Sequence, residues 1–99
     1  MPDNPIQLHV DLEVDPAKER ELEKTFHSVF EPTISRQPGF VSVTLLKARA
    51  SGAHRLVISF QTEEHRVTWV GTADHQAVWP QMEAHLRGAK FAATLWQKL

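Results

Sequence analysis

Two tryptophans and a histidine lie within the thirteen residues of 68–80, TWVGTADHQAVWP. Histidine is the side chain whose unperturbed pKa, about 6.5, lies near neutral pH, so His75 can take up or release a proton there. His75 and Trp79 are four residues apart and Met82 follows three later, so on one helix the three would share a stripe. With Trp69 as a second indole wall, this composition suits a slot that binds a small aromatic molecule and removes a proton from it.

Three phenylalanines from other parts of the chain are expected to complete such a slot. Phe26 would come from the first helix, Phe60 from the third strand, and Phe91 would close the far end. A stripe such as Trp79 and Met82 fits ordinary core packing equally, because apolar residues at helical spacing usually face a core. The sequence therefore leaves two alternatives open, a substrate slot and a filled core.

The other histidines are expected to play lesser roles. His65 falls near a helix start and His9 on the polar face of the first strand, and either could hydrogen-bond to a substrate. His9 could also line a cavity or the seam between two subunits. No histidine and carboxylate spacing gathers several ligands in one place, so we predict no metal ion and no other cofactor.

Composition narrows the function classes further. The chain has 99 residues, a net charge of −1 and no cysteine, so we expect a single domain over residues 1–99 in a reducing, cytoplasmic setting. A charge this small gives no field for nucleic acid or an anionic membrane, and no apolar run is long enough to span a bilayer. Gly-rich phosphate loops and nucleophile elbows are absent from the sequence. A domain of this size gains from a second copy that covers apolar surface, so we expect a homodimer.

The first half of the chain predicts a strand and a helix. Residues 6–14, IQLHVDLEV, alternate apolar and polar side chains as a half-buried strand does. Asp15 is a predicted N-cap with Pro16 in the first helical turn, and residues 22–30 carry one apolar stripe. Pro38 and Gly39 then end the helix.

The second half predicts a hairpin, two helical segments and a last strand. Residues 40–49 and 54–62 are rich in β-branched and aromatic residues on either side of a Ser-Gly turn. A helix capped by Thr62 and ended by Gly71 is expected next, and then a helix from an Asp74 cap to Gly88 that Pro80 kinks or divides. The last strand is predicted over 89–99.

This order of elements predicts an α+β, ferredoxin-like βαββαβ fold with an antiparallel sheet. Helices would cover one face of the sheet. Apolar side chains would remain on the other face and need a cover, and a second subunit could supply it. We expect that set to contain Val41, Val43, Leu45, Val57 and Trp96.

This topology, with GFVSV at 39–43 and SFQTEEHRVTWVGTADHQAVWPQME at 59–83, resembles the antibiotic biosynthesis monooxygenase-like domains. The resemblance runs from about Ile6 to Trp96. It implies a dimeric α+β barrel, and it implies a superfamily that includes cofactor-free oxygenases of polyketide anthrones and quinols, haem-degrading enzymes and small proteins of other kinds.

Two branches of the family can be compared residue by residue. In the anthrone-oxidising branch Trp69 matches a Trp, whereas His65 stands where that branch has Asn and His75 where it has Tyr. Only Arg87 or Lys90 lies near the branch's Arg. In the haem-degrading branch the position of the iron-ligating His is Trp79 here, so a haem ligand would have to be His75 or His85 from a shifted helix.

The leading hypothesis from the sequence is a cofactor-independent monooxygenase of a small aromatic or quinol-type, polyketide-like molecule. His75 would be its base, Trp69 and Trp79 its walls, and His65 or His9 a hydrogen-bonding partner. The alternatives are a non-catalytic ligand-binding or assembly module and, third, a haem-degrading enzyme. A cavity of ~300 Å³ beside the tryptophans would favour the first over the second.

Overall fold

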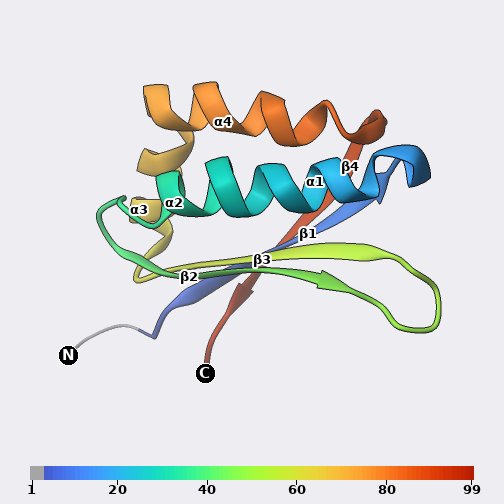
Figure 1. Cartoon of the computed structure of the whole chain (residues 1–99). Helices are drawn as coiled ribbons and strands as arrows, with labels where there is room; N and C mark the ends of the chain where they lie inside the picture. The colour runs from blue at the N-terminus through green and yellow to red at the C-terminus, as the bar shows by residue number, and fades with distance from the viewer. Residues whose placement is uncertain (1–3) are drawn as a thin grey trace.

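The computed structural model describes residues 4–99 and has the predicted ferredoxin-like α+β fold. β1 (Ile6–Val14) leads through one 3₁₀ turn (Pro16–Lys18) into α1 (Glu19–Thr25), a π-helical turn (Phe26–Phe30) and α2 (Glu31–Ile34). The hairpin of β2 (Phe40–Lys47) and β3 (His54–Phe60) follows, and then α3 (Glu63–Val70), α4 (Ala73–Glu83) and β4 (Leu86–Gln97). Figure 1 shows α1, α2 and α4 side by side on one side of the sheet.

The four strands form one antiparallel sheet in the order β2-β3-β1-β4. β1 lies in the centre because the first and last strands of this fold pair with each other, as Leu8 does with Leu95. The alternation predicted for β1 is confirmed, since Ile6, Val10 and Leu12 are buried while Asp11 and Glu13 are exposed.

The first helical segment begins as predicted and contains an irregular turn. The Asp15 carboxylate accepts a hydrogen bond from the Ala17 N–H at 3.0 Å, which caps the helix start. Farther along, the Glu31 N–H bonds to the carbonyl of Phe26, five residues back. Pro32 comes next and has no N–H to donate to the carbonyl four residues back. The regular α-helical hydrogen bonding would therefore be interrupted here, and the wider π turn is accommodated at this point.

The core lies between the helices and the sheet. Seven side chains are less than 2% exposed, and they come from α1, the π turn, α2, β3 and α4: Leu22, Phe26, Phe30, Ile34, Leu56, Phe60 and Met82. The apolar stripe predicted for residues 22–30 supplies three of them, which is why this helix docks on β1 and β3.

A β-bulge changes the face on which the β2 side chains lie. Phe40 pairs with Phe60 but Ser42 pairs with Ser59, so Val41 is the extra residue. The prediction that Val43 and Leu45 face away from the helices is therefore wrong, because both pack against the core. Val57 and Trp96 do lie on the open face, opposite His9 and Gln7 of β1 respectively.

The boundaries of α4 and β4 also differ from prediction. Thr72, not Asp74, caps α4, which runs unbroken through Pro80 and ends at Glu83. β4 begins at Leu86 because that residue pairs with Val14 of β1. The Gly88 signal for a helix end instead marks an irregularity inside the strand, where Gly88 and Ala89 have φ angles of 61° and 54°. Within residues 4–99, no helix is both long and apolar enough to cross a membrane.

Candidate functional site

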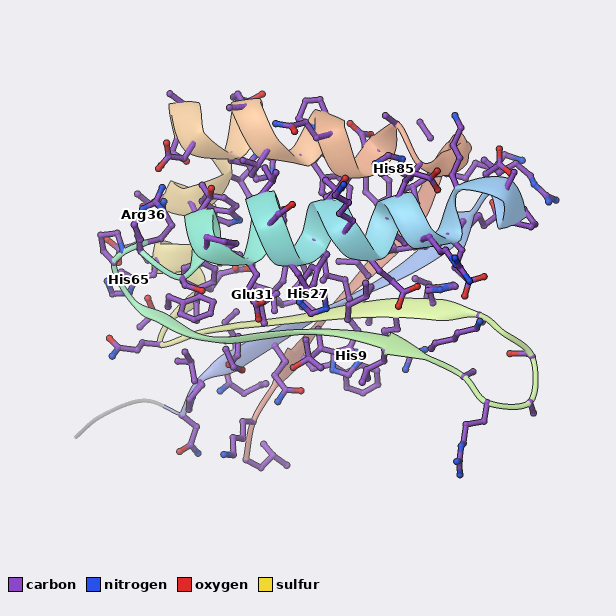
Figure 2. The ribbon with its side chains drawn as sticks, in the orientation of Figure 1. His9, His27, Glu31, Arg36, His65 and His85 are labelled. Atoms are coloured by element: carbon purple, nitrogen blue, oxygen red, sulfur yellow. The ribbon has the colours of Figure 1, made fainter. Side chains whose placement is uncertain are left out.

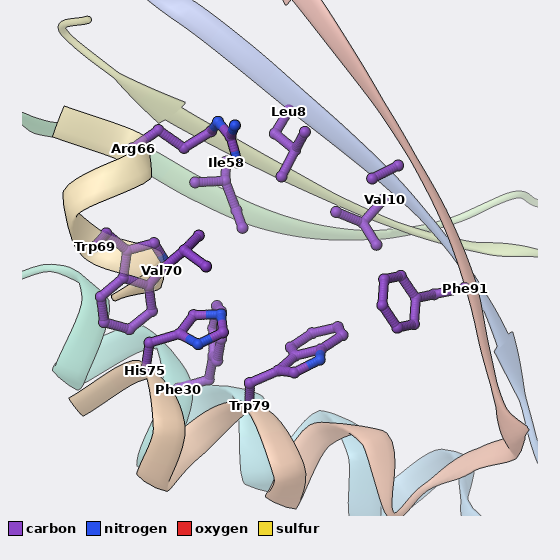
Figure 3. Close-up of a pocket in the computed structure, with 11 residues that line it drawn as sticks. Leu8, Val10, Phe30, Ile58, Arg66, Trp69, Val70, His75, Trp79 and Phe91 are labelled. Carbon is purple, nitrogen blue, oxygen red and sulfur yellow. The ribbon is translucent and has the colours of Figure 1, made fainter. Parts of the chain in front are cut away.

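A cavity of about 260 Å³ lies between the sheet and the second pair of helices, α3 and α4. Figure 3 shows side chains of α3, α4, the π turn and the sheet around it. Its lining comprises Leu8, Val10, Phe30, Ile58, Arg66, Trp69, Val70, His75, Trp79, Phe91 and Ala93. Trp69 and Trp79 both line this cavity, so open space lies beside the two indoles. Their role as walls of a substrate slot stays a prediction.

Four of the predicted residues form one continuous aromatic wall. Ring centroids are 5.0 Å apart for Trp69 and His75, which meet edge to face, and 6.5 Å apart for His75 and Trp79, which lie at 21° to each other. Phe91 of β4 meets Trp79 edge to face at 5.2 Å. The spacing of four between His75 and Trp79 is what places both rings on the same side of α4.

One hydroxyl positions the histidine relative to the first tryptophan. Thr72 Oγ1 accepts a hydrogen bond from the His75 N–H at 3.1 Å, as an N-cap does. The same oxygen donates to the carbonyl of Trp69 at 2.7 Å. Thr72 therefore joins the end of α3 to the start of α4 and fixes the backbone from which His75 projects.

The cavity lowers the pKa of His75. Burial among apolar rings disfavours the charged imidazolium and outweighs the opposite, smaller effect of the Glu83 carboxylate. His75 is therefore neutral at pH 7 and available to accept a proton. Within residues 4–99, the His75 ring has one side-chain hydrogen-bond contact, from Gln76 Nε2 to Nδ1, and at 3.5 Å it is too long to fix the tautomer of the ring.

Arg66 is the charged residue of the lining, and the sequence reasoning did not include it. Its Nη2 donates to Glu63 Oε2 at 3.1 Å and its Nε donates to Glu63 Oε1. The Arg66 side chain is 21% exposed and the Glu63 side chain 42%. Arg66 lies three residues before Trp69 and four before Val70 on α3, so helical spacing from Trp69 would have indicated it.

The floor and back wall of the cavity are formed by residues that the sequence placed on faces but not in a site. Leu8 and Val10 belong to the helix-facing side of β1, with Ile58 and Ala93 beside them on β3 and β4. Phe30 belongs to the predicted stripe of the first helix. No signal in the sequence distinguishes these side chains from those that are packed in the core. Whether such a side chain lines a cavity depends on how closely the opposing helix approaches it.

Several predicted site residues lie elsewhere. Phe26, Phe60 and Met82 are fully buried in the core and do not line the cavity. His65 also lies outside the lining, because its Nδ1 is 2.8 Å from Thr62 Oγ1 and its ring rests against Gly39. A Cβ on Gly39 would stand 2.3 Å from His65 Cγ, so the glycine makes room for this ring.

His9 lies on the opposite face of the sheet from the cavity (Figure 2). Its Nε2 is 3.0 Å from Gln7 Oε1, and its ring centroid is 5.7 Å from that of Trp96. Lining the helix-side slot, one of the two predicted roles for His9, does not match this position. A role at a seam between subunits stays a prediction.

The described residues hold no group of three or more His, Cys, Asp or Glu side chains placed to bind a metal ion. His85, the second histidine considered for haem, bonds through Nε2 to Thr25 Oγ1 at 2.9 Å and does not line the cavity. Among the histidines of residues 4–99, His75 alone is in the lining.

The fold and the site together define a ferredoxin-like α+β domain with an apolar, aromatic-walled cavity between its helices and its sheet. The family model for the antibiotic biosynthesis monooxygenases matches residues 5–81, and the chain belongs to that family. The match includes α3 and α4 up to Gln81, so it contains Trp69, His75 and Trp79. No curated protein matches the chain significantly.

Solved structures with the same fold include several from this family. SnoaB from Streptomyces nogalater, described as a cofactor-independent oxygenase, is 18% identical with a TM-score of 0.82, and the match covers 97% of this chain and 94% of SnoaB. A Bordetella bronchiseptica protein, a candidate antibiotic biosynthesis monooxygenase, is 21% identical with a TM-score of 0.85, covering 97% and 98% of the two chains. A conserved protein from Methanosarcina mazei Go1 is 13% identical with a TM-score of 0.83, covering 97% and 94%. At these identities the likeness shows the fold.

Proposed function

We propose that this protein is a cofactor-independent monooxygenase that oxidises a small phenol or quinol with molecular oxygen in the helix-side cavity. The observation that carries the proposal is a neutral histidine on the wall of a cavity whose other lining residues, Arg66 apart, are apolar. The family and the description of SnoaB support the same reaction class. As in the sequence-based hypothesis, we place the activity in the cytoplasm.

The reaction begins with a proton transfer. His75 takes the hydroxyl proton, and the resulting oxyanion is electron-rich enough to pass one electron to dioxygen. The ring radical and superoxide then join at a ring carbon that bears one hydrogen, which forms a C–O bond. His75 returns its proton to the peroxide, and loss of water leaves a carbonyl at that carbon. One oxygen atom of O₂ is thus in the product and the other is in water.

The cavity wall contributes by orientation and by exclusion of water. Trp69 and Trp79 offer flat surfaces on either side of His75, so a planar ring placed between them presents its hydroxyl to the imidazole. An apolar lining also protects the radical pair from solvent. The volume of about 260 Å³ is just below the range of ~300–1,000 Å³ typical of drug-sized ligands, so we expect one or two fused rings.

Oxygen labelling tests the proposal. With 1,4-dihydroxynaphthalene under ¹⁸O₂, we expect 2-hydroxy-1,4-naphthoquinone with one labelled atom, formed without hydrogen peroxide and above the rate of autoxidation. His75→Gln should lower the enzymatic rate at least tenfold, since general-base catalysis contributes about 10²–10⁴-fold. Ala93→Leu, which fills the cavity from the sheet side, should lower it as well. Exposed His27→Gln is the matched control and should leave the rate unchanged.

Three results would count against this proposal. An unchanged rate in His75→Gln would remove the histidine from the mechanism. Binding of the quinol with no labelled product would favour the non-catalytic ligand-binding module, and a Soret shift on titration with hemin would favour haem binding.

We also propose that two copies of the chain pair through their open sheet faces. Large apolar side chains are exposed on or beside that face, including Trp96 at 55% and Leu46 at 47%. A patch of this kind usually marks an interface. Sedimentation should give a dimer for the wild type and a monomer for Trp96→Glu, and a monomeric wild type would refute the pairing.

A further inference from the structure

The charged group of an otherwise apolar cavity lies away from the base. Figure 3 shows Arg66 projecting from α3 toward Leu8 and Ile58, with Trp69 and Val70 between it and His75. A planar molecule in the cavity therefore meets the imidazole at one end and the guanidinium at the other. Since His75 is neutral at pH 7, Arg66 supplies the positive charge of the lining.

The way Glu63 holds Arg66 leaves a recognition edge free. A guanidinium has five N–H bonds, and Glu63 accepts from Nε and from Nη2 along one side. Two N–H bonds on Nη1 and one on Nη2 remain, and they form the end-on fork that matches a carboxylate in a bidentate pair. No other side chain of residues 4–99 has a hydrogen bond to Arg66 that would occupy this fork.

The Glu63 contact orients the fork of the guanidinium and leaves the N–H groups of that fork free to bind an anion. An i,i+3 pair in which the carboxylate is 42% exposed contributes little stability in water. The apolar surroundings at the other edge of the guanidinium strengthen a pairing made inside the cavity. A ligand with a negative charge at that edge is therefore expected to bind more tightly than a neutral one.

We propose that Arg66 determines specificity for aromatic substrates that carry a carboxylate at the end of the ring system opposite the reacting hydroxyl. This inference rests on the proposed function for the location of the hydroxyl end, but its charge preference is measurable by binding alone. The substrate class is then a one- or two-ring hydroxyaryl carboxylate. Its carboxylate binds Arg66, its rings lie along the Trp69 and Trp79 wall, and its hydroxyl faces His75.

A matched ligand pair tests the charge preference. The probes are 6-hydroxy-2-naphthoate and its neutral isostere 6-hydroxy-2-naphthamide, with dissociation constants measured by calorimetry at pH 7.5. We expect the wild type to bind the carboxylate at least tenfold more tightly than the amide. Arg66→Gln should reduce the preference to within twofold while the amide affinity stays the same, and Arg66→Lys should keep only part of it because an ammonium lacks the fork.

Two further variants separate local from general electrostatics. Glu63→Gln removes the competing carboxylate and should increase the preference for the charged ligand. Arg55→Gln is the matched control, since Arg55 is a 51% exposed arginine paired with Asp11 at 2.7 Å on the open face. The Arg55 variant should keep the wild-type preference.

The outcomes distinguish this inference from the proposed function. Equal affinities for the two ligands in the wild type, or a preference that survives Arg66→Gln, would overturn the role of Arg66 and leave the cavity as a binding site. Failure of both ligands to bind the wild type would overturn the cavity as a binding site and the inference together.

Discussion

The helix-facing side of the sheet has a closed half and a hollow half. Under α1 and α2, Leu22, Ile34, Leu56 and Phe60 are fully buried and fill the space between the layers. Under α3 and α4, Trp79 and the small side chain of Ala93 both line a cavity of about 260 Å³ that remains between the layers. The same two layers thus pack tightly in one half of the domain and leave a cavity in the other.

The largest expected effect lies in the closed half. Phe60→Ala should destabilise the fold by about 3–5 kcal/mol, because it removes a fully buried ring and leaves a void. Phe91→Ala is the matched change in the hollow half, where the residue is 45% exposed, and should cost less than about 1 kcal/mol. Urea unfolding of both variants measures the difference, and similar losses would mean that the two halves are packed alike.

Gly39 lies against α3 of the hollow half, and its substitution is expected to have the next largest effect. It precedes β2, has a φ of 78°, and leaves no room for a Cβ beside His65 of α3. Gly39→Ala should destabilise by roughly 2–4 kcal/mol through backbone strain and overlap. Gly52→Ala has a similar φ of 74°, but its Cβ would meet only Lys47 Cε at 3.9 Å, an ordinary contact distance. The excess loss at Gly39 in chemical denaturation therefore isolates the overlap with His65.

A smaller effect is expected at the junction of α3 and α4. Thr72→Ala removes both hydrogen bonds of one hydroxyl and should cost about 1–2 kcal/mol. The rate should also fall, because His75 loses the contact that holds its backbone. Thr72→Ser keeps the oxygen and should restore stability and rate, so a serine variant as impaired as alanine would show that the methyl group, not the hydroxyl, matters.

The smallest effect is a pH dependence that belongs to the hollow half. Because the pKa of His75 is lowered in the folded state, the unfolded chain binds the proton more readily as pH falls below about 6.5. Protonation of His75 therefore does not change the free energy of unfolding near pH 8. It decreases that free energy as the pH drops from about 7 toward 5. The free energy of unfolding of wild type minus that of His75→Gln should decrease over this window, and a flat difference would contradict a desolvated His75.

Much of the fold follows from local patterns. The strict alternation of residues 6–14, the Asp15 cap and the Thr62 cap are each decided within a few residues, and the structure has all three. The errors occur where a distant partner outweighs a local signal. Leu86 joins β4 because Val14 of β1 lies opposite it, and the bulge at Val41 reverses the expected faces of β2.

The candidate site divides in the same way. Helical spacing alone predicted that His75 and Trp79 would share a side of α4, and a rule of three or four residues would have added Arg66 from Trp69. The same rule could not separate Trp79, which lines the cavity, from Met82, which is fully buried on the same helix. That distinction depends on which side chains of the sheet lie beneath each residue and how much space they fill.

The sequence by itself determined the order of elements, the ferredoxin-like class and the grouping of tryptophans and a histidine on adjacent helices, since these depend on periodicity and capping between near neighbours. Only the tertiary structure decided that the tryptophans border open space, that Phe26 and Phe60 belong to the core, and that His9 faces the other side of the sheet. The physical reason is that volume is left unfilled by the mismatch of side chains from segments far apart in the chain, and no local pattern records the size of an opposing residue.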